Sequence, residues 1–130
     1  MPRTFTLDEA TALLPRLREL LAEMQEQKTA LARAREGLGE MVQLASGNGH
    51  LLESEVTAKR EEAKGLTDRL NELVAELNRM GCELKGLDEG LIDFRAEREG
   101  RTVYLCWKLG EPEIVYWHGL DTGFANRQPL

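Results

Sequence analysis

The chain has 130 residues, the size of one ordinary domain, and 42% of them are hydrophobic, which is enough for a core. Its 17 basic and 23 acidic side chains give a formal net charge of −6. This charge argues against a general nucleic-acid binder, because such proteins neutralise phosphates. No apolar run approaches the ~18 residues of a membrane span, so we expect no membrane partner. The N-terminus lacks the apolar region of a signal peptide, and we therefore expect a cytoplasmic protein.

Residues 6–80 predict an antiparallel helical hairpin of coiled-coil type. They are rich in Leu, Ala, Glu, Arg and Lys, and their apolar residues recur at spacings of three and four. Thr6 and Glu9 have the spacing of a capping box, which marks the start of the first helix. The segment 46–49 contains two glycines and ends this helix, and Gly81 is placed to end the second. Each helix then has roughly 30 residues and a length of about 45 Å.

The apolar residues near the loop of the hairpin predict self-association. A small sheet can cover only part of a hairpin of this length, so the rest of the apolar stripe needs another subunit. We therefore expect a homodimer whose hairpins combine into a four-helix arrangement. The stripe includes Leu31, Leu38, Met41, Leu44, Leu52 and Val56.

Residues 82–118 predict a three-stranded antiparallel sheet, followed by a tail over 119–130. Aromatic and β-branched residues gather here between glycine turns. A turn at Glu99-Gly100 places Asp93 opposite Cys106 on the neighbouring strand. A two-residue turn at Gly110-Glu111 places Val103 opposite His118. Helices followed by strands indicate a single α+β domain over 1–130.

This register divides the sheet into two faces. The apolar face is expected to hold Ile92, Phe94, Ala96, Val103, Leu105, Trp107, Ile114, Tyr116 and His118. The opposite face mixes charges with a small apolar group formed by Leu91, Tyr104, Val115 and Trp117. Two interpretations stay open for that group: the tail covers it with Phe124 as a plug, or it is a partner surface.

The residue types suited to a divalent cation are Asp93, Glu111 and His118. The predicted register argues against one shared site, because Asp93 and His118 point to opposite faces and Glu111 lies at a turn. His118 and Asp121 stand three residues apart and are the remaining candidate pair of metal ligands. We expect no cofactor, with a divalent metal as the alternative.

No recognisable catalytic motif occurs, and the two cysteines are expected to be small buried residues rather than nucleophiles. Cys106 has only Lys108 as a basic neighbour on its face, and Cys82 follows a helix C-terminus, where the dipole disfavours a thiolate.

Two hypotheses follow. The first is a structural or protein-interaction module that self-associates through its hairpin. The alternative is a small metal- or ligand-binding protein, or an enzyme, with a site at the junction of helix and sheet. That site would draw its polar groups from Glu9, Lys85, Asp93, His118 and Arg127.

Motifs at both ends of the chain resemble an uncharacterised bacterial family, domain of unknown function 2203. The first is Phe5-Thr6-Leu7-Asp8-Glu9-Ala10 with Leu13-Leu14-Pro15. The others are Lys85 with Gly90-Leu91-Ile92-Asp93-Phe94, Gly100-Arg101, Leu105-Cys106-Trp107, Gly110-Glu111, Trp117-His118, and Gly123-Phe124 with Arg127. The resemblance implies a stand-alone bacterial protein. It supplies no catalytic residue, cofactor or partner.

Overall fold

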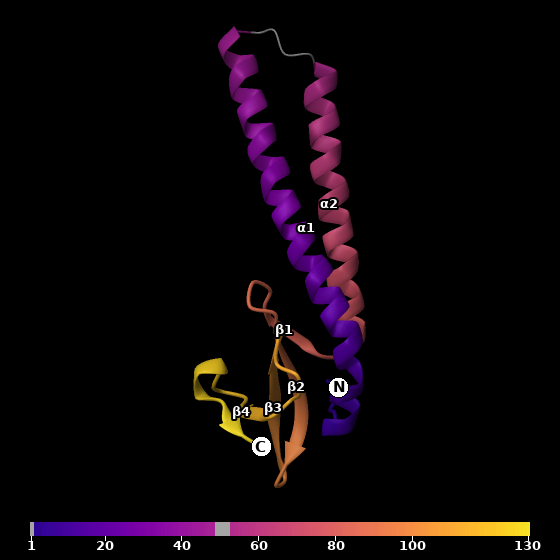
Figure 1. Cartoon of the computed structure of the whole chain (residues 1–130), viewed down its shortest axis with the longest axis vertical. Helices are drawn as coiled ribbons and strands as arrows, with labels where there is room; N and C mark the ends of the chain where they lie inside the picture. The colour runs from indigo at the N-terminus through magenta and orange to yellow at the C-terminus, as the bar shows by residue number, and fades with distance from the viewer. Residues whose placement is uncertain (1, 49–52) are drawn as a thin grey trace. The chain divides into compact units, whose positions relative to one another are not determined.

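The structure is a computed structural model that describes residues 2–48 and 53–130 (Figure 1). Two helices are followed by an antiparallel sheet, which confirms the α+β class and the helical hairpin. The helices are α1 (Leu7–Asn48) and α2 (Glu53–Arg79). The strands are β1 (Glu83–Gly86), β2 (Leu91–Arg98), β3 (Arg101–Lys108), β4 (Tyr116–Gly119) and β5 (Gln128–Pro129), with a short 3-10 helix η1 (Phe124–Asn126) before the last. No helix in the described part of the chain is long and apolar enough to cross a membrane.

The sheet has five strands in the order β1-β2-β3-β4-β5, and the prediction of three strands was wrong. Both additional strands lie at the edges and are too short to show an alternating pattern. β1 has four residues, and its pairing with β2 shifts between Leu84 and Gly86. β5 has two residues, and one of them is Pro129, which cannot donate a ladder hydrogen bond.

The described residues divide into two compact units. The first contains Met1–Ala22 and Ala75–Leu130, and the second contains Glu23–Val74. Helix α1 therefore contributes its first turns to one unit and the remainder to the other. A single domain over 1–130 stays a prediction.

The core of the first unit joins the chain's N-terminal segment to the sheet. The Phe5 and Phe94 rings meet edge to face with centroids 5.3 Å apart, and the Phe5 amide donates to the Arg95 carbonyl at 2.7 Å. The predicted capping box is confirmed: the Thr6 amide donates to Glu9 Oε1 at 2.8 Å, and the Glu9 amide donates to Thr6 Oγ1 at 3.1 Å. The buried apolar side chains of this unit include Ala10, Leu14, Leu17, Leu20, Leu21, Leu77, Ile92, Leu105 and Trp107.

The predicted register between β2 and β3 is confirmed. Ala96 pairs with Val103, Phe94 with Leu105, and Asp93 with Cys106. The two residues of the connecting turn, Glu99 and Gly100, have φ values of 51° and 78°, as a type I′ turn requires. We call the side of the sheet that carries Ile92, Phe94, Ala96, Val103, Leu105 and Trp107 the apolar face; all six side chains are buried.

The predicted register between β3 and β4 was wrong by one residue. His118 pairs with Tyr104 rather than with Val103, and Trp117 pairs with Leu105. The predicted hairpin turn at Gly110-Glu111 does not form. The chain turns one residue earlier, where the Glu111 amide donates to the Lys108 carbonyl at 2.9 Å, and β4 begins only at Tyr116. The Lys108 amide donates to Glu111 Oε1 at 2.7 Å instead of entering a hairpin ladder. The slip exchanges the two faces of β4, since side chains alternate along a strand.

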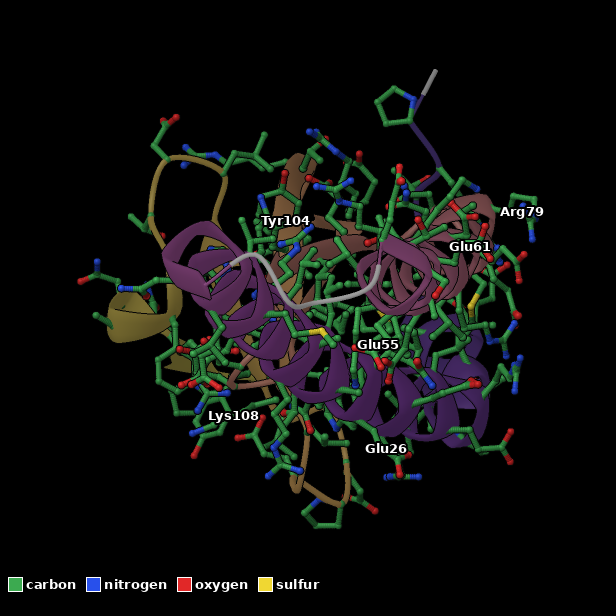
Figure 2. The ribbon with its side chains drawn as sticks, turned by 90° about the horizontal axis from the view of Figure 1, so that it is seen from above. Glu26, Glu55, Glu61, Arg79, Tyr104 and Lys108 are labelled. Carbon is green, nitrogen blue, oxygen red and sulfur yellow. The ribbon has the colours of Figure 1, made fainter. Side chains whose placement is uncertain are left out.

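The second unit is the far part of the hairpin. Arg69 of α2 binds Glu23 of α1 at 2.7 Å, and the buried apolar residues of this unit are Met24, Leu31, Ala34 and Leu73. Exposed acidic residues extend from both helices, including Glu26, Glu55 and Glu61 (Figure 2). The predicted stripe is only partly covered within the unit: Leu38 and Met41 are half-buried, and Leu44 is 60% exposed. Leu52 lies outside the described residues.

Candidate metal centre

Three potential metal ligands from three neighbouring strands meet on the side of the sheet opposite the apolar face, which we call the polar face. Asp93 of β2 and Cys106 of β3 are direct cross-strand partners. His118 of β4 lies opposite Tyr104, two residues from Cys106 along β3, and so points to the same side. One ligand atom from each of the three lies within 4.8 Å of the other two. The residues are 2%, 0% and 2% exposed, respectively.

The hydrogen bonds of His118 define which of its nitrogens faces the group. Nδ1 lies 2.8 Å from the Gly119 carbonyl oxygen, and Nε2 lies 3.0 Å from Asp93 Oδ2. A carbonyl oxygen can only accept, so Nδ1 carries a proton and donates it. Nε2 is then the nitrogen that faces Asp93. An imidazole held through Nδ1 by a backbone carbonyl in this way is the usual arrangement of a metal-ligating histidine.

Asp93 carries a further sign of an incomplete site. Its Oδ1 atom is buried and has no hydrogen-bond partner. More than nine in ten buried polar groups are partnered, so an orphaned carboxylate oxygen beside a thiol and an imidazole calls for a ligand. A cation shared by the three side chains would give this oxygen a partner.

Cys106 does not have the properties of a nucleophile. Burial, the negative charge of Asp93 and contact with that carboxylate raise the pKa of the Cys106 thiol to about 12. Both ring nitrogens of His118 are engaged elsewhere, so the imidazole is not placed to take the thiol proton. The arrangement suits binding of a cation better than nucleophilic attack.

Charged side chains surround the group on the polar face. Glu83 of β1 accepts a hydrogen bond from the Tyr104 hydroxyl at 3.1 Å and another from Arg95 Nε at 3.1 Å. The Lys85 ammonium lies 4.6 Å from the centre of the Tyr104 ring and 3.4 Å from Glu83. Tyr104 and Lys108, both of β3, are labelled in Figure 2. Tyr104 therefore belongs to the wall of the site; from the sequence, its group was expected either to be covered by the tail or to form a partner surface.

The C-terminal segment reaches the same region through Arg127. Its Nη1 donates to both carboxylate oxygens of Glu111, at 2.9 and 3.0 Å. The guanidinium lies 4.1 Å from the centre of the Tyr116 ring and 4.0 Å from that of Phe124. The positive charge of Arg127 opposes the rise in the pKa of the Cys106 thiol.

The structure brings together Asp93 and His118, which the predicted register had placed on opposite faces. It separates His118 from Asp121: Asp121 is exposed in the turn after β4 and, with Arg98 and Trp117, lines a different cavity of about 630 Å³. Glu9 is engaged by Thr6 at the start of α1, and these hydrogen bonds lower the pKa of its carboxyl.

The apolar group expected beside the charges is not one patch. Trp117 lies on the apolar face, whereas Leu91 and Tyr104 lie on the polar face. Tyr104 is buried, Leu91 and Trp117 are half-buried, and Val115 precedes β4 and is exposed. The partner surface proposed for Leu91, Tyr104, Val115 and Trp117 together therefore does not exist as one face.

Sequence reasoning missed Cys106 as a member of the site. Its pairing with Asp93 was predicted, but the wrong orientation of β4 removed the histidine that gives the pair a third ligand. Pro112 was the available signal, because a residue without an amide proton next to the predicted two-residue turn weakens the case for regular pairing there.

A carboxylate, a thiol and an imidazole on three adjacent strands define an α+β protein with a candidate transition-metal centre. The family model described as "Uncharacterized conserved protein (DUF2203)" matches residues 3–130, and the chain belongs to this family. Searches of the curated proteins and of the solved structures gave no match.

Proposed function

We propose that this protein binds one divalent transition-metal ion, of the zinc class, through Asp93, Cys106 and His118. The observation that carries the proposal is the meeting of their three ligand atoms, within 4.8 Å of one another, in a buried site. Carboxylate oxygen, thiolate sulfur and imidazole nitrogen are the ligands that zinc takes in proteins.

The ligand set also defines the class of metal. A dication balances the two negative charges of a carboxylate and a thiolate, so the occupied group would be electrically neutral. A thiolate favours zinc, cobalt or copper(I) over magnesium and calcium, which prefer oxygen ligands. Ligand atoms around tetrahedral zinc stand about 3.3–3.7 Å apart. His118 Nε2 and Asp93 Oδ2 are already 3.0 Å apart, so metal binding needs a shortening of about an ångström only where a separation approaches the 4.8 Å limit.

Elemental analysis of protein purified without chelator tests the proposal first, with about one zinc ion per chain as the expected result. Titration of the metal-free protein with Co²⁺ then reports the ligands, because a thiolate bound to cobalt gives a sulfur-to-metal charge-transfer absorption. Cys106→Ser should abolish this absorption and weaken binding by about 10-fold or more.

Cys82→Ser is the matched control. Cys82 is the other buried cysteine of the chain, and it follows α2 at a position outside the three-residue group. We expect Cys82→Ser to bind cobalt like the unmodified protein. Zinc-free protein that also fails to take up Co²⁺, or equal cobalt spectra for the two serine variants, would disprove the proposal.

A second candidate function, self-association through the hairpin, is favoured by one observation in the second unit. Leu44 is 60% exposed and stands near Leu38 and Met41, which are half-buried. Removing such side chains from water would stabilise an association by about 25 cal/mol for each Å² covered. The neighbouring charges of α1 have both signs, Arg33 and Arg35 against Glu36 and Glu40, so a second copy can pair with them.

Light scattering coupled to gel filtration at micromolar concentration tests this candidate. A homodimer is expected for the unmodified chain and a monomer for Leu44→Glu. Gln43→Glu adds the same charge at the neighbouring exposed position and should remain dimeric. A monomeric unmodified chain would rule out self-association through the hairpin.

A further inference from the structure

We propose that Arg127 is a positioning residue of the metal centre, one that holds the Cys106 sulfur in place by donating a hydrogen bond from its guanidinium. The inference rests on the proposed metal binding. It assigns a role to the C-terminal segment, which contributes none of the three ligands.

Arg127 is itself firmly held. One guanidinium nitrogen donates to both oxygens of Glu111, and the flat group lies between the rings of Tyr116 and Phe124. Glu111 is fixed in turn by the Lys108 amide. The side chain of Arg127 is only 14% exposed, although it carries a full charge. A guanidinium restrained on three sides loses little conformational freedom when it donates a further hydrogen bond.

These contacts hold the Arg127 guanidinium on the side of the sheet that carries the Cys106 sulfur. Tyr116, on which the guanidinium stacks, is the cross-strand partner of Cys106. Side chains of directly paired residues lie on the same face of the sheet, so the guanidinium over the Tyr116 ring is on the side of the sheet that carries the sulfur. Consistent with this position, the guanidinium opposes the rise in the pKa of the Cys106 thiol. Arginine has five N–H donors, and Nη1 is the nitrogen that Glu111 occupies, so the remaining nitrogens can serve the sulfur.

The other cations of the polar face have different partners. Arg95 and Lys85 both bind Glu83, and Lys108 lies over the Phe124 ring. A metal-bound thiolate keeps lone pairs that accept hydrogen bonds, and such second partners orient the ligand and change metal affinity by about 10- to 100-fold. Arg127 is placed to be that partner for Cys106.

The test compares Arg127→Met and Arg127→Lys with the unmodified protein by Co²⁺ and Zn²⁺ titration at one pH. We expect Arg127→Met to weaken metal binding by about 10- to 100-fold and to shift the sulfur-to-cobalt absorption to longer wavelength, because the sulfur loses a hydrogen bond. Arg127→Lys keeps a hydrogen-bond donor and a positive charge but lacks the planar guanidinium group. It should therefore bind metal more tightly than Arg127→Met and less tightly than the unmodified protein. Arg101→Met, at an exposed position at the start of β3, is the control for loss of one positive charge.

The outcomes separate the two proposals. If the unmodified protein binds neither metal, the metal centre itself is wrong. If it binds metal and both Arg127 variants match it within about twofold in affinity and in absorption, only the role of Arg127 is wrong. Equal weakening by Arg101→Met would also overturn that role, since the effect would then be general electrostatics. Circular dichroism checks the fold of each variant, and Arg127→Lys keeps the test decisive if Arg127→Met does not fold.

Discussion

The hydrogen bond from His118 Nδ1 to the Gly119 carbonyl determines what this histidine can do. It places a proton on Nδ1 and leaves Nε2 to face Asp93. A dication bound by both side chains would replace the direct contact between Nε2 and the Asp93 carboxylate. The same backbone bond therefore prepares the ring as a ligand before any metal arrives.

The raised pKa values of the two cysteine thiols predict that both react slowly with alkylating reagents in the folded protein. Burial raises the pKa of Cys82 to about 11, and burial together with Asp93 raises that of Cys106 to about 12. The nucleophile in alkylation is the thiolate, so neither residue should react appreciably with iodoacetamide at pH 8 in the folded, metal-free protein. Mass spectrometry should find both alkylated within minutes in guanidinium chloride. Rapid labelling of Cys106 without denaturant would contradict the structure.

These pKa values also give the sign of a stability change. An unfolded cysteine has a pKa of about 8.5, so between that pH and about 12 the unfolded chain loses thiol protons that the folded protein keeps. The corresponding stability is present below pH 8.5 and is lost as the pH rises through the folded values.

Gly90, just before β2, is a position where a side chain is expected to be costly. Its φ is +69°, and an added Cβ would lie 2.5 Å from the Leu109 Cβ. Gly90→Ala should therefore reduce the free energy of unfolding by about 2 kcal/mol or more, from the backbone conformation and the clash together. Gly100 has a φ of +78° with open space around it, so Gly100→Ala should cost only about 1 kcal/mol. Urea unfolding measures both, and equal losses would contradict the contact with Leu109.

At the scale of elements, the orientation of β4 depends on the loop before it. Glu111 accepts from the Lys108 amide and from Arg127, and its own carbonyl accepts from Trp107 Nε1 at 2.9 Å. The loop is thus organised by side-chain bonds to one residue, and β4 follows in the register that this loop allows.

Glu111→Ala should lower the free energy of unfolding by about 2–3 kcal/mol, because it removes hydrogen bonds to a partly buried arginine and to a strand-end amide. Glu113→Ala changes an exposed acidic residue of the same loop and should stay within about 0.5 kcal/mol of the unmodified protein. Denaturant midpoints provide the comparison. A loss at Glu113 as large as that at Glu111 would disprove this account of the loop.

The part of the fold predicted from the sequence is the part that short-range chemistry determines. The capping box at Thr6 and the turn at Glu99-Gly100 depend on neighbouring residues, and the β2–β3 register follows from that turn. The register of β4 depends on whether the Lys108 amide donates to a carbonyl of the neighbouring strand or to the Glu111 carboxylate, as it does here. The sequence pattern does not show which of these hydrogen bonds forms. The candidate site could not be predicted without it, because the register of β4 decides which face of the sheet carries His118.

At the scale of the molecule, helix α1 runs through two units of different character. Between Leu7 and Ala22 it contributes buried residues to a core that includes the sheet. Between Arg35 and Leu44 no residue of α1 is buried, and the first half of α2 as described has none either. The far ends of both helices therefore depend mainly on backbone hydrogen bonds and intrinsic helix propensity.

Hydrogen exchange should reflect this difference. Amides of residues 35–44 and 56–63 are expected to exchange about 10-fold or more faster than those of residues 11–21 at low protein concentration, because local opening there exposes little apolar surface. If the hairpin self-associates, raising the concentration should slow the first two segments and leave the third unchanged. Equal protection of all three segments in dilute protein would contradict the expected difference between the units.

The three proposed ligands sit on strands that main-chain ladders already join, β2 to β3 and β3 to β4. A zinc finger, by contrast, is unfolded without its ion because the ion itself assembles the ligands. Here the scaffold is complete beforehand, so stripping the ion with a chelator should leave an intact, somewhat less heat-resistant protein. Loading and unloading could then be repeated on the same molecules, as in a reversible receptor for the ion.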